Sequence, residues 1–174
     1  MSAEGFGDSG PCNIDVMCPL GADWQDDKRG VVMLLSGGSG FCTASLINTT
    51  ANDCRPYVLT ANHCSAGAST IFGFNFERPA CGSGTPPSPT TQTVSGATVL
   101  ARFADSDFTL LEMSSAPPES FGAYFNGWNR GTAPATSTIV IHHPQNVSPS
   151  IARRTFPGSV TVGPLGARTV MSAV

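Results

Sequence analysis

Short apolar runs alternate with clusters of turn-forming residues over much of the chain. Each run has the length of a β-strand and is bounded by residues such as Gly, Ser, Asn and Asp, a pattern typical of strands joined by turns. The strands predicted in this way are Val31–Leu35, Phe41–Ile47, Tyr57–Ala61, Ile71–Phe76, Val94–Phe103 (one bent strand or two short ones) and 105–113. The pattern therefore predicts an all-β fold.

The second and third of these runs predict a hairpin whose turn is centred near Asp53. A register that places Ile47 opposite Leu59 also places Cys42 opposite Cys64. Opposed strand residues have Cα atoms about 4.5–5.5 Å apart, within the range of about 4.4–6.8 Å found in disulfides. The register therefore predicts a Cys42–Cys64 bridge, as long as no bulge shifts the pairing.

Composition agrees with the strand prediction and narrows the function. The 19 Gly and 14 Pro of this 174-residue chain disfavour long helices. Only 12% of residues are charged and the formal net charge is −3, so neither nucleic acid nor an acidic membrane surface is expected as a partner. No apolar run approaches the length of a membrane span.

Six cysteines in so weakly charged a chain indicate an oxidising compartment, outside the cell or in a periplasm. A zinc site would be expected to show a Cys-x-x-Cys or His-x-x-x-His spacing, and neither occurs. The first residues, Met1–Gly5, lack the basic and apolar character of a secretion signal. We therefore expect a secreted or periplasmic protein whose signal and pro-segment are not in this chain.

Two titratable residues stand at strand ends and suggest chemistry. His63 follows the apolar run that begins at Tyr57, and Asp107 precedes another. Taken singly, such a histidine is most often structural or solvated, and such an aspartate is most often a turn residue. As a pair, Asp107 would accept the Nδ1 proton of His63 and leave Nε2 free to act as a base.

Four segments of the chain resemble the trypsin-like serine endopeptidases of chymotrypsin fold, most closely the bacterial lysyl endopeptidase branch. The segments are Ser9–Pro19, Leu59–Cys64, Ser106–Glu112 and Ile139–Pro144. Four motifs in one order, over about residues 9–147, make the resemblance specific. It implies a chymotrypsin-like double β-barrel, a polypeptide substrate, no cofactor and a monomer.

The resemblance also implies roles for individual residues. His63 would be the general base and acid, and Asp107 the carboxylate that orients it. Disulfides would join Cys42 to Cys64, in agreement with the hairpin register, and Cys18 to Cys81. In the family, the cysteine that matches Cys12 pairs with one near the C-terminal end, and no cysteine follows Cys81 here. Cys54 has no counterpart in the pattern, so Cys12 and Cys54 are expected either to be free or to pair with each other.

The nucleophile is the element of the resembled triad that the sequence lacks. In the family the serine follows the histidine and the aspartate in a Gly-Ser-Gly type loop, and no such loop occurs after His143. The serines that remain there are Ser148, Ser150, Ser159 and Ser172, and none has the flanking glycines that present a hydroxyl beside an oxyanion hole. We therefore expect this chain alone to be catalytically incompetent. The alternative function is that of a disulfide-linked β domain that binds a protein or a glycan without catalysis.

The resemblance divides the chain into three parts. Residues 1–24 would form an irregular leader linked by disulfides, residues 25–113 a first barrel that holds His63 and Asp107, and residues 114–174 an incomplete second barrel. The strands expected in the last part are Ala123–Trp128 and Thr138–His142. From about residue 148 the sequence ceases to resemble the family, and we expect an interrupted reading frame near residue 147.

Two further motifs carry weaker functional interpretations. Gly7–Pro11 resembles the nucleophile motif of trypsin-like proteases, but a Gly-rich terminus does not hold a nucleophile rigidly against its base. His142 or His143 could join His63 at a metal ion, although adjacent strand residues face opposite sides and only one of them could do so. A flexible leader and a structural strand end are preferred, and no metal is expected.

Overall fold

The computed structural model describes residues 13–129, 137–144, 150–155 and 170–171, the last two segments by their backbone alone. Strands make up most of the regular structure in these ranges, and each helical element there is a short 3₁₀ helix. These helices are η1 (Pro19–Trp24), η2 (Asp27–Gly30), η3 (Asn62–Cys64) and η4 (Glu119–Phe121). No helix among the described residues is long and apolar enough to cross a membrane. The all-β prediction is confirmed.

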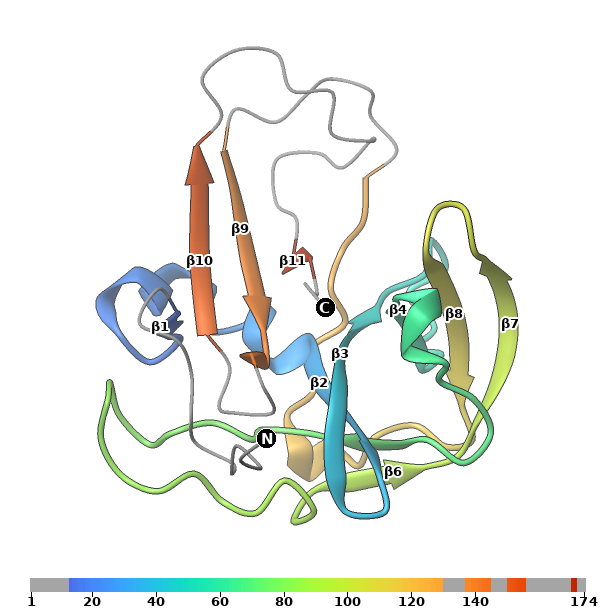
Figure 1. Ribbon diagram of the computed structural model, residues 1–174, viewed down its shortest axis with the longest axis horizontal. Helices are drawn as coiled ribbons and strands as arrows, with labels where there is room; N and C mark the ends of the chain where they lie inside the picture. The colour runs from blue at the N-terminus through green and yellow to red at the C-terminus, as the bar shows by residue number, and fades with distance from the viewer. Residues whose placement is uncertain (1–12, 130–136, 145–149, 156–169, 172–174) are drawn as a thin grey trace, which may run out of the picture.

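The described strands form two sheets (Figure 1). The larger sheet has the order β6-β5-β2-β3-β4-β8-β7 and the smaller sheet has the order β1-β10-β9-β11. The strands of the larger sheet are β2 (Val31–Ser36), β3 (Ser39–Ile47), β4 (Tyr57–Thr60), β5 (Ile71–Gly73), β6 (Thr93–Ser95), β7 (Ala97–Phe103) and β8 (Phe108–Met113). Those of the smaller sheet are β1 (Ile14–Asp15), β9 (Ser137–His142), β10 (Ser150–Thr155) and β11 (Val170–Met171). Every strand predicted before residue 114 is present, although β5 ends at Gly73 rather than at Phe76.

The larger sheet curls back on itself at Gly96. This residue alone separates β6 from β7, the two outer strands of the sheet, so the chain continues directly from one edge to the other. Its φ of +87° bends the chain between the two strands, a conformation that glycine adopts readily. Its N–H donates to the Thr70 carbonyl and its own carbonyl accepts from the Ser114 N–H, both at 2.9 Å. The run Val94–Phe103 is therefore two short strands, one of the two alternatives.

Alternate side chains of the larger sheet point into one apolar core. In β8, Thr109, Leu111 and Met113 are buried and the residues between them are only half-buried. The large buried side chains of this core are those of Val32, Leu34, Leu46, Val58, Phe72, Phe74, Val94, Leu111 and Met113. Burial of one such side chain is worth about 1.5–3 kcal/mol, so this core is the main source of stability around the site described below.

The β3–β4 register differs from the predicted one by two residues. Ile47 pairs with Tyr57, not with Leu59. The connection spans residues 48–56 and is not a turn centred on Asp53, because the pairing places its midpoint at Asn52. Asn52 itself has a φ of +50°. Since the shift is an even number of residues, each side chain still faces the predicted side of the sheet.

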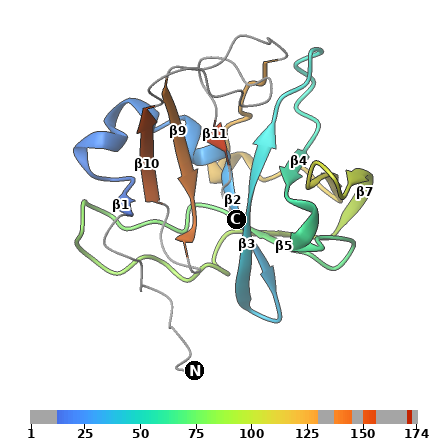
Figure 2. The ribbon, with the colours of Figure 1, turned by 45° about the horizontal axis from the view of Figure 1, so that its top comes forward.

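The smaller sheet joins the two ends of the chain beside the larger sheet (Figure 2). β9 corresponds to the strand predicted at Thr138–His142. β10 pairs with it in an antiparallel direction, with Ile151 opposite Ile141, and β11 pairs with it in a parallel direction. β1 pairs with β10 on the other side. The leader, which we expected to be irregular, therefore contributes a strand and the buried Val16, which packs in one cluster with Ile141.

The strand predicted at Ala123–Trp128 is wrong. In the structure this segment makes a single parallel bridge to β3, between Asn126 and Ile47. The Asn126 N–H donates to the Leu46 carbonyl at 3.0 Å, and its carbonyl accepts from the Asn48 N–H at 2.9 Å. β2 begins opposite Ser45, so the following β3 residues have an open edge that this segment occupies. The segment therefore lies along this open edge of the larger sheet.

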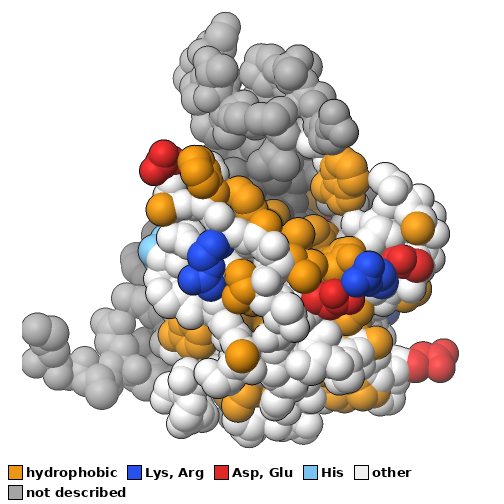
Figure 3. Space-filling model, turned by 90° about the vertical axis from the view of Figure 1, so that its right-hand side faces the viewer, with side chains coloured by type: hydrophobic (Ala, Val, Ile, Leu, Met, Phe, Trp, Pro, Cys, Tyr) orange, Lys and Arg blue, Asp and Glu red, His pale blue; other side chains and the backbone are white. Residues whose placement is uncertain are grey.

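One face of the larger sheet exposes apolar side chains. Leu59 of β4 and Leu100 and Phe103 of β7 are 39%, 44% and 53% exposed. Figure 3 shows this side of the molecule, where hydrophobic side chains form a band with charged groups at both of its ends.

Candidate active site

A single helical turn after β4 positions His63. Ala61 is still extended, and residues Asn62–Cys64 form the 3₁₀ helix η3. Ser65 ends this helix in the left-handed region, with a φ of +54°, and its N–H donates to the Asn62 carbonyl at 3.0 Å. The His63 side chain is 55% exposed, whereas the next residue, Cys64, is buried.

The turn between β7 and β8 positions Asp107. Its N–H donates to the Ala104 carbonyl at 3.1 Å, and its φ is +49°, a left-handed conformation that Asp tolerates better than most residues. The Asp107 carbonyl accepts from the Asn62 N–H at 3.1 Å. This backbone bond joins the Asp107 turn to the His63 turn, so the two candidate residues lie on adjoining, mutually bonded segments.

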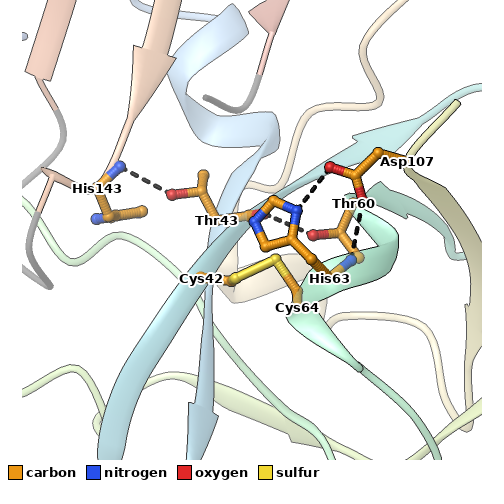
Figure 4. The surroundings of a disulfide bond; sticks show 7 residues. All are labelled: Cys42, Thr43, Thr60, His63, Cys64, Asp107 and His143. Carbon is orange, nitrogen blue, oxygen red and sulfur yellow. Dashed lines mark hydrogen bonds and ion pairs between the residues drawn. A yellow bond between two sulfur atoms is a disulfide. The ribbon is translucent and has the colours of Figure 1, made fainter. Parts of the chain in front are cut away.

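The side chains of His63 and Asp107 are in direct contact (Figure 4). Asp107 Oδ2 lies 2.6 Å from His63 Nδ1, and Oδ1 accepts from the His63 backbone N–H at 2.9 Å. The bond from the backbone N–H, followed by that from the imidazole, lowers the pKa of Asp107 below its usual value of 3.8. An ionised carboxylate can only accept, so in the neutral imidazole Nδ1 carries the proton and Nε2 keeps a lone pair.

This arrangement can hold and release a proton at Nε2. The sequence predicted both residues and their pairing, and the structure brings them together across 44 positions of the chain. A carboxylate behind Nδ1 stabilises an imidazolium that forms when Nε2 takes up a proton. The geometry therefore suits a general base, and it equally suits a histidine that binds a metal ion through Nε2.

One of the two disulfides lies beside this site. Cys42 of β3 is bonded to Cys64 directly beside His63, with Cα atoms 6.1 Å apart (Figure 4). Cys64 lies in η3 and not opposite Cys42 in a strand. A 3₁₀ helix rises about 2.0 Å per residue against about 3.3 Å in a strand, so the helical turn keeps Cys64 near β3 despite the shifted register.

The second disulfide joins Cys18, just before η1, to Cys81 in the connection between β5 and β6. It links the leader to that long connection. Cys54 is a free and exposed cysteine. Cys12, its possible partner in the sequence analysis, lies outside the described residues.

Two buried threonines connect the site to the smaller sheet, and sequence reasoning missed both. Thr60 donates its hydroxyl to the Thr43 carbonyl at 2.8 Å, and Thr43 Oγ1 accepts from the His143 backbone N–H at 3.0 Å. Both threonines are nearly inaccessible to solvent. Their signal in the sequence is a hydroxyl residue inside an otherwise apolar run, which requires a partner when it is buried.

Most of the other serine candidates cannot be compared with the site. Gly7–Pro11, Ser148, Ser159 and Ser172 lie outside the described residues, and only the backbone of Ser150 is described, in β10. Among described residues, the group that could hold a metal ion includes His63 but neither His142 nor His143. Burial lowers the pKa of His142, which is half-buried in β9.

Comparison with known proteins identifies sequence relatives. Residues 6–167 match the family described as "Lysyl endopeptidase, C-terminal domain". The chain is 30% identical over 158 residues to a lysyl endopeptidase of Pseudomonas aeruginosa, in an alignment that covers 82% of this chain and 34% of the relative. The chain thus spans about a third of the length of this curated relative. The family match also includes residues 148–167, where we expected the resemblance to end.

One solved structure supports the fold. The MamO protease domain from Magnetospirillum magneticum matches with a TM-score of 0.50 at 12% identity, over 81% of this chain and 69% of that one. An inactive-form mutant of Rv3671c from M. tuberculosis matches with a TM-score of 0.47 at 16% identity, over 86% of this chain and 58% of that one. With the curled sheet, the match to the MamO protease domain confirms the predicted all-β, chymotrypsin-like fold.

Proposed function

Because this chain belongs to the lysyl endopeptidase C-terminal domain family, we propose that it is a serine-type, trypsin-like endopeptidase domain by descent. His63 is the general base and acid of the proposed triad, and Asp107 orients it. The observation that carries the proposal is the 2.6 Å contact between His63 Nδ1 and Asp107 Oδ2, with more than half of the His63 side chain open to solvent. The proposed substrates are polypeptides, and the two disulfides support a secreted or periplasmic location.

In the proposed reaction, the dyad activates a serine hydroxyl that attacks the carbonyl of a peptide bond. His63 Nε2 takes the hydroxyl proton, Asp107 stabilises the resulting imidazolium, and Nε2 then returns the proton to the leaving amine. Water releases the acyl group in a second passage through the same steps. The His63–Asp107 dyad supplies the proton-transfer half of this mechanism.

We further propose that these 174 residues alone do not hydrolyse peptides. The sequence contains no Gly-Ser-Gly type motif after His143, and the oxyanion hole of such enzymes is built from the same loop. In a well-studied serine protease, loss of the nucleophile alone costs about 10⁶-fold in kcat. In domain terms, residues 25–113 form the proposed first barrel, and residues 114–174 a partial second one.

A serine-directed fluorophosphonate probe tests the inactive part of the proposal. The purified chain should remain unlabelled, as should its His63→Ala variant. Labelling of the chain that His63→Ala abolishes would show that a nucleophile is present, and would overturn the claim of inactivity while supporting the serine-type assignment.

A chimera tests the roles of the dyad. Residues 1–147 of this chain would be followed by the part of the P. aeruginosa relative beyond the position aligned with residue 147. The chimera should hydrolyse peptides. Asp107→Asn should reduce its kcat by about 10⁴-fold, the effect of the same change in a serine protease with a Ser-His-Asp triad. A folded, active chimera that retains full activity with His63→Ala would sink the proposal.

The alternative function, binding of a protein or glycan without catalysis, draws support from the exposed apolar side chains of β4 and β7. If the fluorophosphonate probe leaves the chain unlabelled, a pull-down distinguishes the endopeptidase domain from the binding domain. Specific capture that survives both His63→Ala and Asp107→Asn would favour the binding function, because the dyad would then be dispensable.

A further inference from the structure

Three residues with metal-binding side chains meet at one point of the site. One possible ligand atom from each of Cys42, His63 and Cys64 lies within 4.8 Å of the other two. Among the described residues, these three form the group whose side chains could hold a metal ion. The sequence does not show it, because Cys42 and Cys64 are 22 positions apart and match no zinc-ligand spacing. The fold brings them together by placing η3 against β3.

We propose that reduction of the Cys42–Cys64 disulfide converts this point into a binding site for Zn²⁺, with two thiolates and His63 Nε2 as ligands. A dithiol or phosphine reductant supplies two electrons, and two protons are taken up, to give two thiols. Each thiol releases its proton when it binds the metal, so Zn²⁺ replaces two protons on the sulfur atoms.

The distances fit a tetrahedral ion after small movements. Zn–S bonds of about 2.3 Å and Zn–N bonds of about 2.0–2.1 Å place the ligand atoms of a tetrahedral site about 3.5–3.8 Å apart. The sulfur atoms are 2.06 Å apart in the disulfide and must separate, which rotation of the cysteine side chains allows. The ligand atoms already lie within 4.8 Å of one another, about 1 Å more than the separation in such a tetrahedral site.

His63 is already oriented as a zinc ligand. Its Nδ1–H is held by Asp107 Oδ2 at 2.6 Å, which leaves the Nε2 lone pair for a metal. A carboxylate that accepts from the second ring nitrogen of a ligating histidine is the usual support of zinc sites and increases the basicity of the ligand. Thiolate ligands select a soft divalent ion such as Zn²⁺ over Mg²⁺ or Ca²⁺.

The fourth coordination position remains for water. The His63 side chain is 55% exposed, so solvent reaches the site at His63, although Cys64 is buried. Two cysteines and one histidine with an open position form a ligand set known from catalytic zinc sites. The proposed site therefore differs from a closed structural one, and it is available only in the reduced protein.

Cobalt(II), a spectroscopic substitute for zinc, tests the proposal. The background carries Cys12→Ser and Cys54→Ser, so that the cysteines outside the two bridges do not bind metal. After anaerobic reduction and removal of the reductant, one equivalent of Co²⁺ should give thiolate-to-cobalt charge-transfer absorption and the intense visible bands of tetrahedral cobalt. The oxidised protein should give neither signal.

Four variants separate this site from other sources of binding. Cys18→Ser with Cys81→Ser should keep the signal, whereas Cys42→Ser with Cys64→Ser should abolish it. Asp107→Asn should weaken the affinity about 10–100-fold, the usual effect of losing the group behind a ligating histidine. His63→Ala should weaken it at least as much. Unchanged affinity in His63→Ala, or binding that follows Cys18 and Cys81, would overturn the proposal.

Thermal unfolding followed by circular dichroism keeps the test decisive if reduction weakens the fold. Zn²⁺ should raise the Tm of the reduced protein and leave that of the oxidised protein unchanged, because only the reduced native state binds the ion. A reduced chain that Zn²⁺ neither stabilises nor refolds would show that the site does not form.

Discussion

Asp107 holds His63 at two points, one on the backbone and one on the side chain. Its Oδ1 accepts from the His63 backbone N–H at 2.9 Å and its Oδ2 contacts the imidazole Nδ1 at 2.6 Å. The carboxylate would therefore remain attached to the turn even without the imidazole. This double contact sets the orientation of the ring before any substrate or metal arrives.

The first prediction follows from the order of these two contacts. The pKa of Asp107 lies below 3.8, and the hydrogen bond from the His63 backbone N–H is the largest single cause, ahead of the hydrogen bond from the imidazole. In His63→Ala the pKa of Asp107 should rise, but it should remain below 3.8 because residue 63 keeps its N–H. Carbon-detected NMR titration of the Asp107 carboxyl measures both values. A full return to 3.8 in His63→Ala would show that the backbone bond does not matter.

The same shift predicts how stability depends on pH. A carboxyl group with a lowered folded-state pKa stabilises the protein above its unfolded-state pKa, and this contribution is lost as pH falls through the folded-state pKa. The free energy of unfolding should therefore decline below about pH 4, and it should decline less in Asp107→Asn. Urea unfolding at a series of acidic pH values measures the difference. Identical pH profiles for the two proteins would contradict the prediction.

The elements of the fold could be predicted where local sequence determines them. Apolar runs between turn residues located β2, β3, β4 and β8 to within about three residues, because strand length and alternation are local properties. The β3–β4 register could not be predicted to the residue. It depends on a connection in which Asn52 and Cys54 adopt left-handed backbone conformations, and nothing in the residue types announces them.

Pairings between segments that are distant in the sequence could not be predicted either. The apolar segment 123–128 has the composition of a strand, but the open edge of β3 decides its structure. The pairing of β1 with β10 joins segments from opposite ends of the chain. The dyad was predictable because strand ends and a family motif marked His63 and Asp107. The metal group around Cys42 was not, since only the folded chain brings its members together.

The buried pair of Lys28 and Glu77 carries a third prediction. Lys28 Nζ lies 2.7 Å from Glu77 Oε1, with side chains 7% and 24% exposed. Removal of one partner from a buried pair costs about 3–5 kcal/mol, because the other charge loses its compensation. Lys28→Met should therefore cost about 3 kcal/mol, the lower end of that range, since Glu77 keeps some contact with solvent. Chemical denaturation measures the loss.

The double variant and a surface pair serve as controls. Lys28→Met with Glu77→Leu should be more stable than Lys28→Met alone, since an apolar pair leaves no buried charge. Arg55→Met breaks the exposed pair with Glu112 and should cost much less. If Lys28→Met and Arg55→Met were equally mild, the burial of Lys28 would have no energetic meaning.

The two disulfides should differ in their contribution to stability. Cys42–Cys64 closes a loop with a sequence separation of 22 and Cys18–Cys81 one of 63. The chain-entropy model gives about 3 kcal/mol for the shorter loop and about 4 kcal/mol for the longer one. Paired Cys→Ala variants of each bridge, compared by urea unfolding, measure both. A larger loss for Cys42 and Cys64 would indicate that native contacts around His63, and not loop length, dominate.

Three glycines test whether segment 123–128 is packed against the larger sheet. A Cβ on Gly30 would lie 2.6 Å from the Tyr124 carbonyl oxygen and 2.3 Å from Asn126 Nδ2, so backbone would have to move. Gly30→Ala should therefore cost about 1–3 kcal/mol, the usual effect of overpacking.

Gly67 and Gly37 serve as controls. Gly67 has open space and no left-handed φ, and Gly67→Ala should be neutral or stabilise by up to about 1 kcal/mol. Gly37 also has open space but a φ of +58°, so Gly37→Ala measures the backbone cost alone, about 1–2 kcal/mol. Urea unfolding of the three variants ranks them. If Gly30→Ala were as harmless as Gly67→Ala, the Tyr124 and Asn126 contacts with η2 would not exist in solution, and the segment would be free to pair elsewhere.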